Sequence, residues 1–150
     1  MRHIFMIAGA LIIMNGCSQN SNPISSTSDT IKSGTLQYTF STPKALYGIH
    51  DTLNAAFAVY NDGVTTDTIA VGDGLFRWSL QNVAGKTIMF GGGSNNVVER
   101  LPINPGQRKQ IYFINQIIAD TSGKAVVPGS YSLNAALHTT LSFSLKLSIQ

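Results

Sequence analysis

The stretch Leu141–Ile149, LSFSLKLSI, decides the fold class of this 150-residue chain. Apolar side chains stand at every second position, and the residues between them are serines and one lysine. This period of two buries one face of a β-strand and leaves the other in water, whereas a helix would spread the same side chains around its circumference. The stretch therefore predicts a strand of an antiparallel sheet that is covered on one face.

The same alternation recurs along the chain, and most runs end in residues that favour turns, such as Asn61-Asp62-Gly63 and Asn104-Pro105-Gly106. Short strands at spacings of roughly 8–12 residues with turn signals between them indicate a sandwich or a barrel. We expect an all-β domain, an antiparallel β-sandwich, over residues 35–150. The expected strands are Leu36–Phe40, Leu53–Val59, Thr65–Val71, Phe76–Leu80, Thr87–Phe90, Val97–Ile103, Gln110–Asn115, Tyr131–Leu137 and Leu141–Ile149.

The first seventeen residues, MRHIFMIAGALIIMNGC, predict a lipoprotein signal. Arg2 gives a positive start, an apolar run without charge follows, and Gly16 precedes Cys17, the only cysteine of the chain. The run is far shorter than the roughly 20 apolar residues that cross a bilayer. Ordinary cleavage would want a small residue in place of Met14. We expect a signal peptide over residues 1–16 and lipidation of Cys17.

The residues around the acylated cysteine predict a location in the cell envelope. Because Ser18 rather than Asp follows Cys17, the signal resembles those of lipoproteins sorted to the outer membrane of a two-membrane cell. Residues 17–34 hold too few apolar side chains to offset the entropy of ordering them, so we expect a flexible tether there. The alternative is a first strand around Ile24. With a tether, a chain that begins near Ser33 should be as stable as the whole mature domain.

Charge and cysteine content exclude several partners. The formal net charge is +3, and only Arg108-Lys109 among the basic residues outside the signal are adjacent. No basic stripe can follow a phosphate backbone, so nucleic acid is not an expected partner. With Cys17 acylated, no second thiol remains for a disulfide, and the core alone must hold the domain.

Catalytic and metal-binding patterns are weak. His50 beside Asp51 resembles a base with its orienting carboxylate, but neighbouring strand residues face opposite sides, and no G-x-S-x-G motif supplies a nucleophile. A zinc site needs three or four ligands, and the two distant histidines His50 and His138 do not provide them without a free cysteine. The aspartates near Gly63 and Gly74 lack the regular oxygen spacing of a calcium loop and favour hairpin turns. We expect no enzyme activity, no metal and no cofactor.

Two loops are the candidate partner contacts. The longer is Gly91-Gly92-Gly93-Ser94-Asn95-Asn96, which opens no helix and so lacks half the field of a phosphate site. The shorter is Asp120–Lys124, which offers Lys124 as a contact for a protease of trypsin-like specificity. A solvated lysine after a turn is the plainer interpretation.

Three stretches of the C-terminal two-thirds carry a family resemblance: NVAGK at Asn82–Lys86, LPINPGQ at Leu101–Gln107, and SGKAVVPGSYSLNAAL at Ser122–Leu137. They are similar to the intracellular proteinase inhibitor (BsuPI-type) domain, over about Leu53–Ile149. The resemblance implies an immunoglobulin-like sandwich and, as an activity, proteinase inhibition. The family places a tryptophan after the Gly-Lys turn, where this chain has Thr87-Ile88-Met89, and this departure weakens the transfer of the activity.

Local physics accounts for part of the resemblance without any appeal to function. In Val127-Pro128-Gly129-Ser130-Tyr131, proline and glycine favour a turn, and Tyr131 then enters the sheet as a buried ring whose hydroxyl needs a partner. Two functions remain open. One is a non-catalytic binding or scaffolding module on the envelope that meets a protein or a glycan, and the other is a proteinase inhibitor of the BsuPI type.

Overall fold

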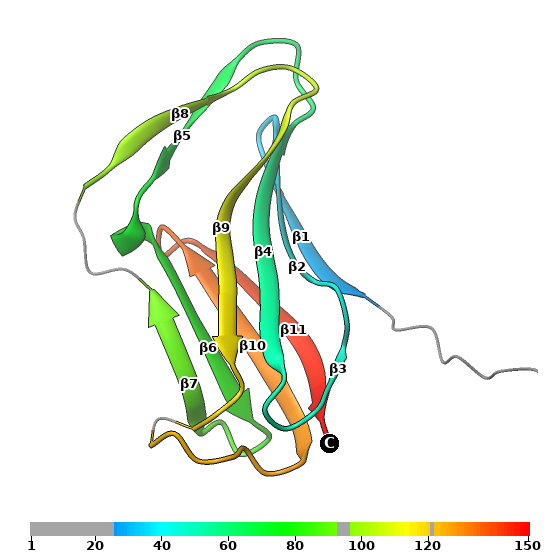
Figure 1. Cartoon of the computed structure of the whole chain (residues 1–150). Coiled ribbons are helices and arrows are strands. Elements are labelled where there is room, and N and C mark those ends of the chain that lie inside the picture. Colours follow the sequence, from blue (N-terminus) through cyan, green and yellow to red (C-terminus); the bar gives the residue numbers. More distant parts are fainter. Residues whose placement is uncertain (1–25, 93–96, 121) are drawn as a thin grey trace, which may run out of the picture.

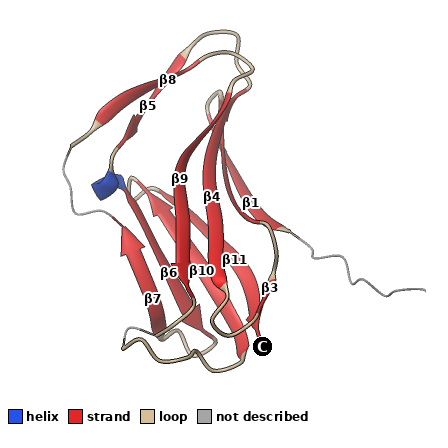
Figure 2. Cartoon of the chain, in the orientation of Figure 1, coloured by secondary structure: helices blue, strands red, loops and turns tan. Residues whose placement is uncertain are grey.

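The computed structural model of the chain describes residues 26–92, 97–120 and 122–150. The predicted all-β class is confirmed, and a short 3-10 turn at Asp73–Leu75 interrupts the strands (Figure 2). No helix in these ranges is long and apolar enough to cross a membrane. The strands are β1 Thr27–Ser33, β2 Leu36–Thr42, β3 Leu46–Tyr47, β4 Thr52–Asn61, β5 Asp67–Val71, β6 Phe76–Asn82, β7 Thr87–Gly92, β8 Glu99–Ile103, β9 Arg108–Ile117, β10 Gly129–Leu137 and β11 Leu141–Ile149.

The strands form a sandwich with a projecting ribbon (Figure 1). One sheet has the order β1-β2-β4-β9, and the other has the order β3-β11-β10-β6-β7. The chain crosses between the sheets several times, as in immunoglobulin-like Greek keys, and all pairs are antiparallel except β3 with β11. Strands β5 and β8 pair only with each other and extend beyond one end of the sandwich.

The core lies between the two sheets and follows the alternation of the sequence. In β11 the side chains of Phe143, Leu145, Leu147 and Ile149 are buried, while the residues between them are exposed. Phe143 meets Phe57 of the opposite sheet edge-on, with ring centroids 4.9 Å apart and planes at 86°. Such aromatic contacts add to the stabilisation from burial, and they fix how the two sheets sit on each other.

The start of β10 carries a hallmark of immunoglobulin-like sandwiches. The Tyr131 hydroxyl donates a hydrogen bond to the Val127 carbonyl at 2.6 Å, four residues upstream, and the ring is buried. This arrangement is the tyrosine corner that closes the connection between the two sheets. It confirms the expectation that Tyr131 enters the sheet with a paired hydroxyl.

The prediction of a flexible tether is wrong for residues 27–33, which form β1. The strand pairs with β2 along its whole length. Ile31 packs against the core, and the Asp29 carboxylate accepts the Ser144 backbone N–H of β11 at 3.0 Å. Backbone pairing therefore offsets the ordering entropy that the few apolar side chains could not. The sandwich begins near Thr27 rather than at residue 35, whereas Cys17 and the signal peptide lie outside the described residues.

Candidate functional site

A groove of about 610 Å³ lies over the outer face of β6, β10 and β11. The register brings Ser79, Asn134 and Ser144 side by side in one row across the three strands. The next row is Arg77, Ala136 and Ser142. All these residues alternate with core positions, so their side chains point away from the core. Short side chains thus leave the face concave, and hydroxyl and amide groups line it together with atoms of Trp78, Ala135, Ala136 and Phe143.

The amide of Asn134 is the centre of this surface. Its Nδ2 donates to Gln81 Oε1 of the neighbouring strand at 3.2 Å, which fixes the orientation of the side chain. Asn134 lines the groove, and its Oδ1 atom makes no hydrogen bond to a described residue. A ligand can therefore find an oriented acceptor in the middle of the groove.

Arg77 forms one wall of the groove. Its Cγ would lie only 3.2 Å from a Cβ at Gly92, so the stem runs close over that glycine. Gly92 has a φ of 145° and approaches the Phe76 carbonyl as well, which no other residue type would tolerate there. Arg77 makes no hydrogen bond or ion pair to any residue in the described part of the chain. Its exposed guanidinium is a positive charge that no described residue pairs.

Asp29 of β1 stands on the opposite wall. Its Oδ2 atom accepts the Ser144 N–H at 3.0 Å, on the part of the β11 edge that β3 does not cover. An unpaired edge N–H is a site for unwanted pairing, and the carboxylate covers it. The Asp29 carboxylate thus forms a hydrogen bond within the fold, whereas the Arg77 guanidinium on the other wall remains available to bind a ligand.

The prediction of a loop over residues 91–96 is wrong for its first two residues, because Gly91 and Gly92 belong to β7. A Cβ at Gly91 would lie 2.5 Å from the Trp78 Nε1 atom, so the indole requires a glycine beneath it. Close packing therefore explains why glycines occupy the last two positions of β7. Gly93, Ser94, Asn95 and Asn96 lie outside the described residues.

Lys124 lies in a tightly bonded loop between β9 and β10. Oδ1 of Asp120 accepts the Ser122 hydroxyl at 2.6 Å, the Ser122 N–H at 2.9 Å and the Lys124 N–H at 2.8 Å. These bonds, the Ser122 hydroxyl first, hold the pKa of Asp120 below its usual value. The Asp120 N–H in turn donates to the Lys124 carbonyl at 2.7 Å. This loop and the end of β7 lie at opposite ends of the sandwich, so the fold does not bring the two predicted contacts together (Figure 1).

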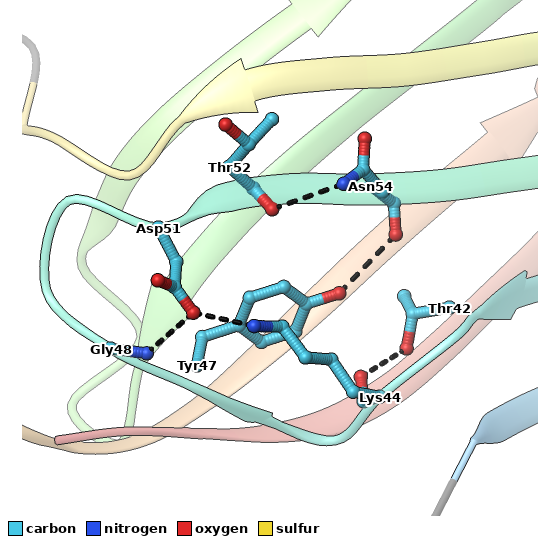
Figure 3. Close-up of polar contacts among 7 residues, drawn as sticks. All are labelled: Thr42, Lys44, Tyr47, Gly48, Asp51, Thr52 and Asn54. Carbon is cyan, nitrogen blue, oxygen red and sulfur yellow. Dashed lines mark hydrogen bonds and ion pairs between the residues drawn. The ribbon is translucent and has the colours of Figure 1, made fainter. Parts of the chain in front are cut away.

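Of the predicted His50-Asp51 pair, Asp51 takes part in a structural cluster at the β3 end of the sandwich (Figure 3). Asp51 accepts the Lys44 ammonium at 2.5 Å and the Gly48 N–H at 2.9 Å, and these contacts lower the pKa of its carboxyl. The Lys44 nitrogen also sits 4.7 Å from the ring centroid of the fully buried Tyr47. The cluster fastens the short strand β3 beside β11, and no contact links the His50 ring to the Asp51 carboxylate.

His138 is also used by the fold. Its Nε2 atom lies 2.8 Å from the Ala70 carbonyl, which makes this nitrogen the protonated one. The contact ties β5 to the β10–β11 turn. Among the residues that the structure describes, no three His, Cys, Asp or Glu side chains gather closely enough to hold a metal ion.

No family model matches the sequence, and no curated protein matches it either. Solved structures with a similar arrangement include a β-glucosidase from Listeria innocua in complex with gluconolactone, at a TM-score of 0.45 and 10% identity over 83% of this chain and 16% of that one. The β-glucosidase EmGH1 from Erythrobacter marinus follows at 0.44 and 14%, with coverage of 83% and 16%. Pseudomonas fluorescens alkylpurine DNA glycosylase AlkC, bound to DNA with an abasic site analogue, gives 0.46 and 11%, with coverage of 73% and 28%. This chain spans less than a third of each, and similarities at this level carry no functional inference.

Proposed function

We propose that this chain is a non-catalytic binding module that an acylated Cys17 holds at the cell envelope, where it captures an envelope protein or glycan. The observation that carries the proposal is the groove over β6, β10 and β11, with its oriented Asn134 amide and its unpaired Arg77. Both side chains stand on strands of a packed sandwich, so the backbone that carries them is already ordered before binding.

The route of the chain supports display close to a membrane. Thr27, where β1 begins, is ten positions after Cys17. Ten residues reach at most about 35 Å, so the acyl chains would keep the sandwich next to the bilayer. In a two-membrane cell, the resemblance of the signal around Ser18 to outer-membrane sorting signals supports this bilayer being the outer membrane.

The test combines the anchor with the groove in living cells. A photoreactive amino acid at Ser144 should yield an envelope adduct, whereas the same group at Val64, which is 94% exposed on the far loop, should not. The Cys17→Ala variant should lose lipid label, remain unprocessed and leave the detergent phase. Retained label would refute the anchor. An adduct from Val64 alone would refute the groove as the binding surface.

A proteinase inhibitor of the BsuPI type is the second candidate, and one feature favours it. The Asp120–Lys124 loop is held by its own hydrogen bonds, and inhibitors need such stiffness because a disordered loop loses affinity when it is ordered on binding. The same bonds argue against a substrate-like role. A substrate-like loop offers its scissile carbonyl to the oxyanion donors of the protease, whereas the Lys124 carbonyl already accepts the Asp120 N–H.

A further inference from the structure

The floor of the groove can bind a ligand only through its side chains. Strand β10 lies between β6 and β11, so its backbone groups are engaged in the two ladders. An incoming peptide strand needs a free sheet edge, and the groove offers none at its centre. Contact therefore falls to Ser79, Asn134 and Ser144, whose hydroxyl and amide groups both donate and accept. A polyhydroxylated ligand has the same dual character.

The charge of the groove selects among such ligands. The positively charged Arg77 guanidinium matches carboxylate or phosphate oxygens with two parallel donors. At the other wall, the Asp29 carboxylate repels an anion. The groove therefore fits a ligand that carries its negative charge at the Arg77 end and neutral polar groups over the row that ends at Ser144.

An exposed aromatic ring extends this row by one strand. Phe90 of β7 pairs with Ser79 of β6, and paired residues face the same side of a sheet. Its side chain is 71% exposed. The face of the ring is electron-rich and attracts the weakly positive C–H groups of a sugar ring.

We infer that the groove binds an acidic saccharide: Arg77 meets its carboxylate or phosphate, the Ser79–Asn134–Ser144 row meets its hydroxyl groups, and Phe90 covers a ring face. The inference rests on the proposed function and names the chemical class of its ligand. An acidic peptide is the less suitable occupant, because peptide recognition draws on apolar anchor pockets or sheet edges. The row presents no apolar anchor pocket, and at its Ser144 end the edge N–H of β11 is already bonded to the Asp29 carboxylate.

The experiment is calorimetric titration of the full acylated protein in non-ionic detergent. The carboxylate probe is trigalacturonate, and the phosphate probe is pentamannose 6-phosphate. The neutral probes are the methyl ester of the first and the unphosphorylated form of the second. At least one acidic probe should bind about tenfold or more tightly than its neutral form. Arg77→Gln should abolish this preference.

Matched variants separate this site from general electrostatics. Arg100→Gln removes the same charge from the exposed face of β8 and should leave both affinities unchanged. Phe90→Ala should weaken acidic and neutral probes alike by several-fold, since ring contact does not depend on the charge. Because Arg77 and Phe90 are exposed, these variants keep the core intact.

Three outcomes would overturn the inference: no preference for either acidic probe, equal effects of Arg77→Gln and Arg100→Gln, or tighter binding of hexaglutamate than of both saccharides. The in-cell adduct at Ser144 distinguishes this failure from failure of the proposed function. An adduct that consists of protein or neutral glycan would sustain the binding module and refute the acidic saccharide. Absence of any adduct would refute both the acidic-saccharide ligand and the proposed binding function of the groove.

Discussion

The Tyr112 hydroxyl donates to the Gly72 carbonyl at 2.7 Å and accepts the Gly72 N–H at 2.8 Å. Gly72 directly follows β5 of the ribbon, and Tyr112 belongs to β9 of the sandwich. The tyrosine ring stacks on Phe76 with centroids 4.5 Å apart and planes at 9°. The Tyr112 hydroxyl thus holds the base of the ribbon, while its ring packs on the aromatic core.

Tyr112→Phe should keep the ring contact and lose both hydrogen bonds to Gly72. Because the backbone groups of Gly72 are then left without this partner, we expect a loss of about 1–2 kcal/mol of unfolding free energy. In the Tyr112→Phe variant, hydrogen exchange of the β5 and β8 amides should speed up more, relative to wild type, than exchange of the β10 amides. Tyr60→Phe is the control, since the Tyr60 hydroxyl bonds to no described residue. Equal loss in both variants would contradict the role of Tyr112.

The strand β1 should contribute measurably to stability. A chain that begins at residue 35 loses the β1–β2 ladder, the Ile31 contact with the core and the Asp29 cap on Ser144. We expect its unfolding free energy to fall by at least about 2 kcal/mol relative to a chain that begins at residue 26. Exposed edges of β2 and β11 should also promote association. Equal thermal midpoints for the two chains would restore the interpretation of residues 27–34 as a tether.

The strands that the sequence predicts are those whose alternation is local. In β11 each buried residue is followed by a polar one, so the period alone identifies both the strand and its inner face. By contrast, β1 offers Ile31 as its only large apolar side chain, and its stability comes from pairing with β2. The two-residue strand β3 pairs with β11 about a hundred positions later, and no local pattern carries that information.

The groove could not be predicted from the sequence for a related reason. Ser79, Asn134 and Ser144 come from three segments, and only the register of the sheet places them in one row. One signal was present: short polar residues recur at outward positions of all three strands. Arg77 was visible only as one of several scattered basic residues, because its lack of a partner is a property of the fold.

The unfolding free energy should fall at acid pH, and protonation of Asp51 should account for part of this fall. The Lys44 ammonium and, next, the Gly48 N–H hold the folded pKa of Asp51 below its usual value. A lowered folded pKa stabilises the protein above the unfolded pKa, near 3.8, and this contribution is lost as pH falls toward the folded pKa. In urea titrations Asp51→Asn should therefore be less stable than wild type at pH 7, with the gap closing below about pH 4. A gap that stays constant with pH would contradict this assignment.

The last prediction concerns Lys124 and proteases. The Lys124 N–H and carbonyl are both bonded to Asp120, so a protease would have to break the loop before the carbonyl could enter its oxyanion site. We expect micromolar or weaker inhibition of trypsin, chymotrypsin and subtilisin in steady-state rate measurements. Lys124→Ala should change the inhibition of trypsin no more than Lys86→Ala, which removes an exposed lysine from the β6–β7 turn. Nanomolar inhibition of trypsin that disappears only with Lys124→Ala would instead establish the inhibitor function.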